Sequence, residues 1–251
     1  MAYILIKPLK LRKMLRKVSL SSLFKDPLLD PVELRFDNKG LWVCQYSEKH
    51  DLAVLANFKP EYFYEYHILP PFQIWIKEVL EDMRKVLKLE KVVKILLDEE
   101  RIIFKGELEE YSTLRQNTKI DTIDSADITK RDFGLSLKKL KPHKVYKLDL
   151  SQLKLMKAEQ LTFDYGEKLV ASVSVGEDLQ GRPIKTYRRR LIYEANSGEG
   201  SGRVTLYYDI VEKIVKNMSG LIYLVFTEEG AVVFSQKRGT FTTTYILFPV
   251  I

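Results

Sequence analysis

The residues VELRFDNKGLWVCQYSEKHDLAVLANFKPEYFYEY, from Val32 to Tyr66, decide the fold class. Apolar and polar residues alternate on both sides of DNKG at 37–40, and this period of two predicts two strands joined by a tight turn. Gly40 can adopt the positive φ that such a turn needs. A third alternating run, Leu52 to Ala56, follows the polar SEKH at 47–50. The stretch therefore predicts a three-stranded antiparallel meander.

The pattern of this stretch occurs twice in the chain. LRFD at 34–37 recurs as LTFD at 161–164, an offset of 161 − 34 = 127 residues. The helix-then-hairpin pattern at 80–104 recurs at 206–234. Similar segments at a nearly constant offset indicate a duplicated unit. We therefore expect two similar halves, each with a strand, a helix, a meander, a second helix and further strands.

Composition limits the class of protein. The chain has 251 residues, which is enough for one large or two small domains, and its 45% hydrophobic content permits folded cores. Its single cysteine, Cys44, excludes an intramolecular disulfide. No signal peptide is apparent, and the apolar runs have the length of strands, so we expect a soluble, intracellular protein without membrane contact.

Basic residues dominate the charge and one predicted helix. The formal net charge is +7, which favours polyanionic partners. Residues 8–18 have apolar side chains at helical spacing, and the other positions after Leu9 are all cationic. Like-charged neighbours on a helix cost roughly a few tenths of a kcal/mol per pair. This helix is therefore expected to contact a polyanion, the alternative being a solvated face.

Groups that would support catalysis do not converge in the sequence. His50, His67 and His143 lack the spacing of metal ligands, and one cysteine cannot build a zinc site. The glycine-rich run at 198–202 lacks the lysine and hydroxyl residue of a phosphate-binding loop, so we expect a hairpin loop there. The sequence predicts a protein that is not an enzyme, with no cofactor and no metal site.

The order of LRFDNKGL, SEKH, LAVL and FKPEYFYEY resembles the first domain of the PCNA family of archaeal and eukaryotic sliding clamps. LEDMRKVLK at 80–88, VVKILLDEERIIFKGE after it and the C-terminal YILFPVI resemble the same family in the same order. The resemblance implies an α+β, ring-forming fold with two similar clamp-type domains, antiparallel sheets outside and four helices on one face. It implies domains at 1–115 and 139–251 and a connector at 116–138, with a short helix expected near 150–159.

This resemblance implies a DNA sliding clamp, a processivity factor for replication and repair. Three copies in a ring would surround double-stranded DNA and contact its phosphates without reading sequence. Family members are usually acidic overall, so the positive net charge is a departure. The residues that correspond to DNA-facing positions, with local additions, are Arg12, Lys13, Arg16, Lys17, Arg84, Lys85, Lys88, Lys213 and Lys216.

The resemblance also implies surfaces for subunits and clients. The expected partners are a DNA polymerase, other clamp-binding proteins, a clamp loader, and either identical or paralogous clamp subunits. The subunit edges would carry Glu107, Glu109 and Glu110 on one side and Lys185, Arg188, Arg189 and Arg190 on the other. The client site would comprise Tyr46, Ile120, Ile123, Ala231, Ile246 and Pro249.

Two other functions stay open on sequence alone. A checkpoint-type clamp in damage signalling would have the same fold, and a metal-dependent nuclease could also grip DNA with basic helices. A clamp of archaeal origin would be cytoplasmic and associated with the nucleoid, whereas a eukaryotic one would be nuclear.

Overall fold

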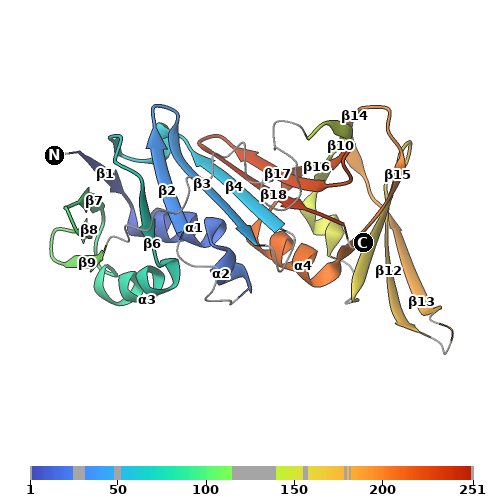
Figure 1. Ribbon diagram of the computed structural model, residues 1–251, viewed down its shortest axis with the longest axis horizontal. Helices are drawn as coiled ribbons and strands as arrows, with labels where there is room; N and C mark the ends of the chain where they lie inside the picture. The colour runs from blue at the N-terminus through green and yellow to red at the C-terminus, as the bar shows by residue number, and fades with distance from the viewer. Residues whose placement is uncertain are drawn as a thin grey trace. The chain divides into compact units, whose positions relative to one another are not determined.

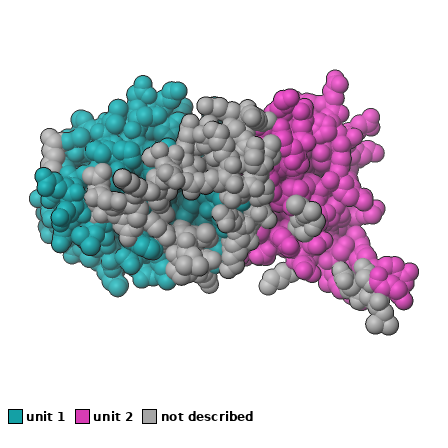
Figure 2. Space-filling model, viewed as in Figure 1, with its two compact units in different colours: residues 1–47, 54–128, 237–243 teal, residues 48–53, 129–236, 244–251 magenta. Residues whose placement is uncertain are grey.

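The chain divides into two compact units, drawn in different colours in Figure 2. Unit 1 comprises residues 1–47, 54–128 and 237–243, and unit 2 comprises residues 48–53, 129–236 and 244–251. The structure, a computed structural model (Figure 1), describes residues 2–24, 32–47, 52–114, 140–154, 158–177, 180 and 182–249. The expected connector at 116–138 lies outside the described residues.

Two sets of antiparallel strands build unit 1. Neighbouring strands of the first set follow the order β5-β1-β7-β8-β9, with β1 (Tyr3–Ile6), β5 (Glu65–Tyr66), β7 (Val93–Leu97), β8 (Arg101–Lys105) and β9 (Glu110–Leu114). The second set follows the order β4-β3-β2-β6, with β2 (Val32–Asp37), β3 (Gly40–Ser47), β4 (Leu52–Phe58) and β6 (Phe72–Ile74). The predicted meander is thus confirmed as β2-β3-β4.

The turn of this meander has the predicted chemistry. Asp37 pairs with Gly40, whose φ is +123°. A Cβ on Gly40 would lie 2.1 Å from the carbonyl oxygen of Phe58, so the position needs glycine for space as well as for φ. The Asp37 carboxylate accepts hydrogen bonds from the Lys39 amide (2.7 Å) and from the Trp42 indole (3.0 Å). The turn is therefore fixed by its own residues.

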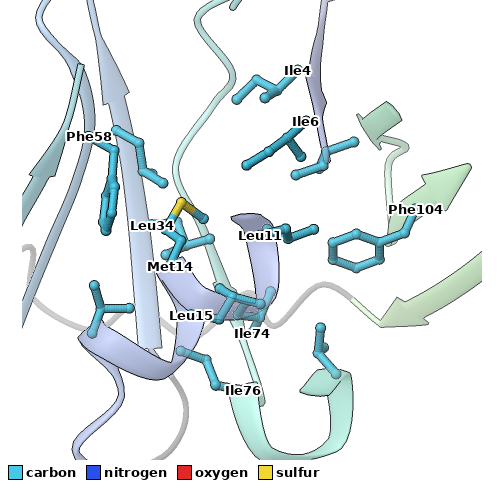
Figure 3. Packing of buried hydrophobic residues seen from close by; sticks show 14 of the residues in the cluster. Ile4, Ile6, Leu11, Met14, Leu15, Leu34, Phe58, Ile74, Ile76 and Phe104 are labelled. Atoms are coloured by element: carbon cyan, nitrogen blue, oxygen red, sulfur yellow. The ribbon is translucent and has the colours of Figure 1, made fainter. Parts of the chain in front are cut away.

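The helices of unit 1 cover its core. Among the described residues they are α1 (Pro8–Val18), α2 (Leu20–Phe24), α3 (Ile76–Val86) and the short 3-10 helix η3 (Pro60–Tyr62). Figure 3 shows Leu11, Met14 and Leu15 of α1 among Ile4, Ile6 and other core residues. Full burial of an aliphatic side chain stabilises a fold by about 1.5–3 kcal/mol, so these residues hold α1 on the strands. The charged positions of α1 then face away from this core.

Unit 2 contains a one-turn 3-10 helix, η5 (Leu150–Leu153), and one α-helix, α4 (Tyr208–Asn217), among its described residues. One set of neighbouring strands follows the order β14-β10-β16-β17-β18, and the other follows β13-β12-β11-β15. The strands are β10 (Pro142–Asp149), β11 (Gln160–Tyr165), β12 (Val170–Glu177), β13 (Pro183–Arg190), β14 (Tyr193–Ser197), β15 (Gly202–Tyr207), β16 (Leu221–Thr227), β17 (Val232–Arg238) and β18 (Phe241–Leu247).

The sequence repeat is a repeat of topology. When the strands of each unit are numbered along the chain, β14-β10-β16-β17-β18 has the same spatial order as β5-β1-β7-β8-β9. In the same way, β13-β12-β11-β15 has the spatial order of β4-β3-β2-β6. Strand β11 therefore corresponds to β2. Strand β11 carries LTFD and β2 carries LRFD, the two copies of the repeated motif. By the same correspondence α4 matches α3, β13 matches β4, and β18 matches β9.

The helix expected near 150–159 is short, as expected, and is a 3-10 helix in the described residues, while 155–157 lie outside them. The described helical residues there form only η5, in which the Asp149 carboxylate accepts a hydrogen bond from the Ser151 amide at 2.8 Å. The carbonyls of Gln152 and Lys154 accept hydrogen bonds from the guanidinium of Arg189, at 3.0 and 3.3 Å. In an α-helix those carbonyls would bond to amides four residues later. These bonds hold the end of η5 against β13, and the long helices that the structure describes are α1, α3 and α4.

The glycine-rich run at 198–202 connects β14 to β15, but the expected hairpin loop is wrong, because β14 pairs with β10 and β15 pairs with β11 in a different set of strands. The Gly200 amide donates to the carbonyl of His143 at 3.1 Å. A Cβ on Gly200 would lie 2.0 Å from the imidazole of His143, so glycine lets the loop close over this ring. This local packing accounts for the loop without a bound phosphate.

None of the helices in the described part of the chain combines the length and the apolar character needed to cross a membrane.

Candidate nucleic-acid interface

Helix α1 presents the most cationic surface of the three long helices. It has five basic residues and no acidic residue: Lys10, Arg12, Lys13, Arg16 and Lys17. Its buried positions are Leu11, Met14, Leu15 and Val18, which leaves Lys10, Lys13 and Arg16 exposed and Arg12 and Lys17 half-buried. The helical period thus separates one apolar face from one positive face.

Two of these cations are engaged with unit 1 itself. The Lys10 ammonium donates to the Tyr62 carbonyl at 3.1 Å and lies 5.1 Å from the centre of that ring. The Lys17 ammonium lies 5.3 Å from the centre of the Phe241 ring. Burial, assisted by the nearby Arg238, lowers the pKa of Lys17. Lys13 and Arg16 are therefore the exposed cations on which α1 would depend for contact with DNA.

Helices α3 and α4 mix positive and negative charge. The predicted residues Arg84 and Lys85, and Lys88 beyond the helix, are exposed, but α3 also carries Glu78, Glu81 and Asp82. On α4, Lys213 pairs with Asp209 (3.3 Å) and Lys216 pairs with Glu212 (3.0 Å). Exposed ion pairs of this kind contribute only about 0–1 kcal/mol, so a phosphate can compete for these lysines. Of the three long helices, α1 alone has cationic residues and no acidic residue.

The predicted subunit edges are edge strands in their own sets. Strand β9 ends the order β5-β1-β7-β8-β9, and β13 begins the order β13-β12-β11-β15. Every residue of β13 is exposed. Edge strands present unpaired backbone groups that another strand can bond. The sequence therefore placed both predicted edges on strands that are able to accept a partner.

The side chains of these edges carry opposite charge. Glu107, Glu109 and Glu110 are exposed beside or on β9, where Glu110 also lies 3.5 Å from Lys105. Lys185, Arg188, Arg189 and Arg190 are exposed on β13. Arg189 donates to the carbonyls at η5, and side chains alternate along a strand, so Arg188 and Arg190 lie on the opposite face from Arg189.

Large apolar side chains are exposed at the same edges. Leu108 is 76% exposed and Leu114 is 64% exposed, near or on β9. Ile184 is 64% exposed and Tyr187 is 40% exposed on β13. Exposed apolar groups that cluster with edge backbone are a mark of protein contact sites. Charge and apolar surface thus coincide at both edges.

A glutamate that the sequence analysis did not single out shapes the loop before β9. The Glu90 carboxylate accepts hydrogen bonds from the backbone amides of Glu107 (2.9 Å), Leu108 (2.8 Å) and Glu109 (2.9 Å). These bonds stabilise the charged carboxylate and lower the pKa of Glu90 below its ordinary value of 4.5. Glu90 therefore positions the acidic loop that leads into the edge strand.

We expect this loop to loosen in acid. Folding lowers the pKa of Glu90 below 4.5. The ionised carboxylate therefore stabilises the loop fully above pH 4.5, and this stabilisation is lost as the pH falls through the pKa of Glu90 in the folded protein. NMR can follow amide hydrogen exchange at Leu108 and Glu109 over this range. As the pH falls, the protection of these amides, which is the intrinsic exchange rate divided by the observed rate, should decrease. Glu90→Gln should show weak protection at every pH, whereas Glu100→Gln, in the exposed β7–β8 turn, should behave like the wild type. Unchanged protection in Glu90→Gln would contradict the role of this carboxylate.

The predicted client residues are placed as follows. In unit 2, Ala231 and Ile246 are buried and Pro249 is half-buried, while in unit 1 Tyr46 is half-buried. A Cβ on Gly230 would lie 3.9 Å from Cγ of Pro249, so the C-terminal segment lies against the turn that carries Ala231. Ile120 and Ile123 lie outside the described residues, and the client site stays a prediction.

Within the described ranges, no three histidine, cysteine, aspartate or glutamate side chains gather in a cluster that could hold a metal ion. His67 lies with its ring centre 4.8 Å from that of Tyr3, and His143 lies under the 198–202 loop. Both are thus engaged in local packing.

The arrangement of strands and helices is that of a known class of protein, the sliding clamps of the PCNA type. The structure of the C-terminal region of FEN-1 bound to A. fulgidus PCNA has a TM-score of 0.72 and 14% identity, over 100% of this chain and 99% of that chain. The PCNA2-PCNA3 complex from Sulfolobus tokodaii has a TM-score of 0.70 and 11% identity, over 98% of each chain. No protein-family model matches the sequence, and no curated protein matches it.

This chain therefore has the PCNA-type clamp fold along its whole length, with two similar clamp-type domains. The fold inferred from the sequence resemblance is confirmed. Identities of 14% and 11% speak for the fold alone.

Proposed function

We propose that this chain is a subunit of a sliding clamp that encircles duplex DNA and tethers replication and repair proteins, as a scaffold without catalytic activity. The observation that carries the proposal is the pairing of two unlike edges on one clamp fold, an acidic edge at β9 and a basic edge at β13. Two different, complementary patches on one chain favour head-to-tail association, which closes into a ring when the rotation permits.

The duplication supports this association. Strand β13 corresponds to β4, and β18 corresponds to β9. Within unit 1, the start of β18 packs at the end of β4: the Lys59 amide donates to the carbonyl of Thr240 at 2.9 Å, and Phe241 stacks on Phe58 with ring centres 5.8 Å apart. The equivalent strands β13 and β9 end their own sets. A neighbouring copy would supply for β13 the kind of contact that β4 already has.

Contact with DNA would be electrostatic and independent of sequence. Phosphate contacts from lysine and arginine release counterions and carry no base information, which suits a ring that slides. Lys13 and Arg16 on α1 would contribute most, with Arg84, Lys85 and Lys88 beside them. Lys213 and Lys216 would contribute by exchanging their partners, Asp209 and Glu212 respectively, for phosphates.

The structural neighbours support two kinds of protein partner. One is a clamp bound to the C-terminal region of FEN-1, which supports a site for clamp-binding proteins in this chain. A polymerase is the expected client, and Pro249 is among the predicted client residues. The other is a complex of PCNA2 with PCNA3, which supports paralogous subunits as an alternative to three identical chains. A clamp loader would open the ring, whether it is made of identical or of paralogous subunits. The protein would act in the compartment that holds the cell's DNA.

The proposal predicts a ring that holds DNA topologically. Sedimentation equilibrium should give a mass near 3 × 29.3 = 87.9 kDa for the chain alone, or for its complex with paralogous chains a comparable trimer. After loading with a clamp loader and ATP, the protein should stay on circular plasmid DNA through a high-salt wash and leave when a restriction enzyme cuts the plasmid.

Equal retention on circular and linear DNA by a monomer would overturn the proposal. The nuclease alternative predicts that plasmid is nicked in the presence of Mg²⁺ or Mn²⁺, whereas the clamp leaves the plasmid intact. A checkpoint clamp would pass the retention test and is distinguished by its clients.

A further inference from the structure

A basic groove lies in unit 1 between the start of α1 and the segment that follows α3. It has a volume of about 620 Å³, within the range of roughly 300–1,000 Å³ that is typical of small-molecule sites. Helices α1 and α3 are in contact, and Figure 1 shows them on the same part of unit 1. Diffuse contact with a DNA backbone needs no concave surface, so the groove calls for a separate explanation.

Four cations line the groove, namely Lys7, Arg12, Lys88 and Lys91. The one carboxylate among its lining residues, Glu90, already accepts three backbone hydrogen bonds. The Nε of Arg12 is buried and has no hydrogen-bond partner among the described residues. Buried donors in proteins are nearly always paired, so this guanidinium is poorly satisfied by the fold, and its terminal nitrogens are the atoms with which Arg12, as a lining residue, would meet an anion.

The N-terminus of α1 adds to this positive potential. Lys7 is the N-cap residue, no side chain caps the helix, and the first turn contains no acidic residue. The open amides and the helix dipole at such an end favour phosphate groups. The Lys7 ammonium lies 5.6 Å from the centre of the Tyr64 ring, and a hydrogen bond to Tyr64 raises the pKa of Lys7. Lys7 therefore stays protonated beside the helix end.

The groove also offers apolar and aromatic surface. Met83 and Leu87 are buried beneath it, and Tyr64, on its wall, is 53% exposed. An aromatic ring beside several cations suits a ligand that has a flat π-system joined to phosphates. We propose that this groove binds a nucleotide, with its phosphates on Arg12, Lys88 and the α1 N-terminus and its base stacked on Tyr64.

The nucleotide could be a free nucleoside triphosphate or an unpaired nucleotide of a nucleic-acid strand, because both offer the same chemistry. The proposal goes beyond the clamp function, which needs only phosphate contacts. It also concerns unit 1 alone, so it can fail while ring formation succeeds, and the reverse also holds.

The test uses the full chain and three probes: ATP, fluorescein-labelled hexathymidylate, and inorganic pyrophosphate, which lacks a base. Titration calorimetry and fluorescence anisotropy should detect ATP, hexathymidylate or both, and the probe that binds identifies the source. Tyr64→Ala should weaken the probe that binds by about 5- to 50-fold because stacking is lost, while Tyr64→Phe keeps the ring and should bind normally. Pyrophosphate should bind equally to all three proteins.

Lys7→Gln and Arg12→Gln should each weaken all binding probes by about tenfold, since charge-assisted hydrogen bonds are lost. Lys168→Gln removes the same charge from an exposed position of unit 2 and should have no effect. Thermal unfolding of each variant shows that it is folded, and the exposed Tyr64 and Lys7 are safe to replace. Absence of binding to ATP and hexathymidylate, or equal losses in Lys7→Gln and Lys168→Gln with none in Tyr64→Ala, would overturn the proposal.

Discussion

Replacing Arg188 and Arg190 with glutamate is expected to dissociate the proposed ring. Both side chains are exposed on the edge strand β13, and each would face the acidic edge of a neighbour at Glu107, Glu109 and Glu110. The change places like charges opposite each other, which costs several kcal/mol in an interface. Each 1.4 kcal/mol is about tenfold in affinity, so every subunit contact should weaken by about 100-fold or more.

Light scattering of the purified protein should then report a monomer at concentrations where the wild type is a trimer. Lys168→Glu with Lys237→Glu, which reverses two exposed charges away from β13, should leave the trimer intact. Adding Glu109→Arg and Glu110→Arg to the Arg188→Glu, Arg190→Glu chain restores opposite charges across the contact and should restore the trimer. An unchanged mass in the first variant would rule out this edge as the subunit contact.

The parts of the fold that the sequence predicted well depend on local patterns. The β2-β3-β4 meander follows from alternation and from a turn whose glycine is required by the Phe58 carbonyl. The α1 face follows from helical spacing, because buried positions at 3.6-residue intervals leave only one side for charge. The duplication was visible for the same reason, since equal local patterns at a constant offset produce equal strand orders.

The helix near 150–159 was expected to be short, because the turn before Leu161 leaves little room for it, and η5 is short. What the sequence did not predict is that the carbonyls of Gln152 and Lys154 bond to Arg189, which lies more than thirty residues later in the chain. A pattern of nearby residues contains no information about that bond. Tertiary contacts override local propensity most easily in short helices, where few backbone bonds are lost.

The candidate site was predictable in its charges and not in its shape. Lys13 and Arg16 stand out because α1 has no acidic residue, and the edge strands stand out by resemblance. Glu90, Lys7 and Lys91 lie in segments without a period, and their importance comes from neighbours that the fold supplies. Three amides that converge on Glu90 are an arrangement that only coordinates reveal.

The structure was also needed to show which of the helix cations are already engaged with other groups of the protein. Spacing gave a positive face to each helix, yet Lys213 and Lys216 lie within 3.3 and 3.0 Å of acidic residues one turn earlier. Lys17 lies over the Phe241 ring and is half-buried. The nine residues predicted to contact DNA are therefore unequal, and the exposed cations of α1 should dominate.

Reversing Lys13 and Arg16 to glutamate is expected to produce the largest loss of DNA binding. Both residues are exposed on a helix that has no compensating acid, so the change removes two phosphate contacts and adds two repulsive charges per subunit. Each lost phosphate contact reduces the slope of log affinity against log salt by about 0.9. Duplex binding at low salt should weaken by roughly 10- to 100-fold, uniformly across sequences. Fluorescence anisotropy with a labelled duplex over a series of salt concentrations measures both quantities.

The matched comparison is Lys213→Glu with Lys216→Glu on α4. These lysines are already paired with Asp209 and Glu212, so phosphate must first displace an acid, and their reversal should weaken duplex binding several-fold less than reversal on α1. Light scattering should show the same oligomer for both variants, since neither pair lies on β9 or β13. Equal losses from the two helices would mean that the ion pairs of α4 open freely on DNA, and no loss from α1 would remove that helix from the DNA interface. The comparison therefore separates a surface that α1 dominates from one to which the helices contribute equally.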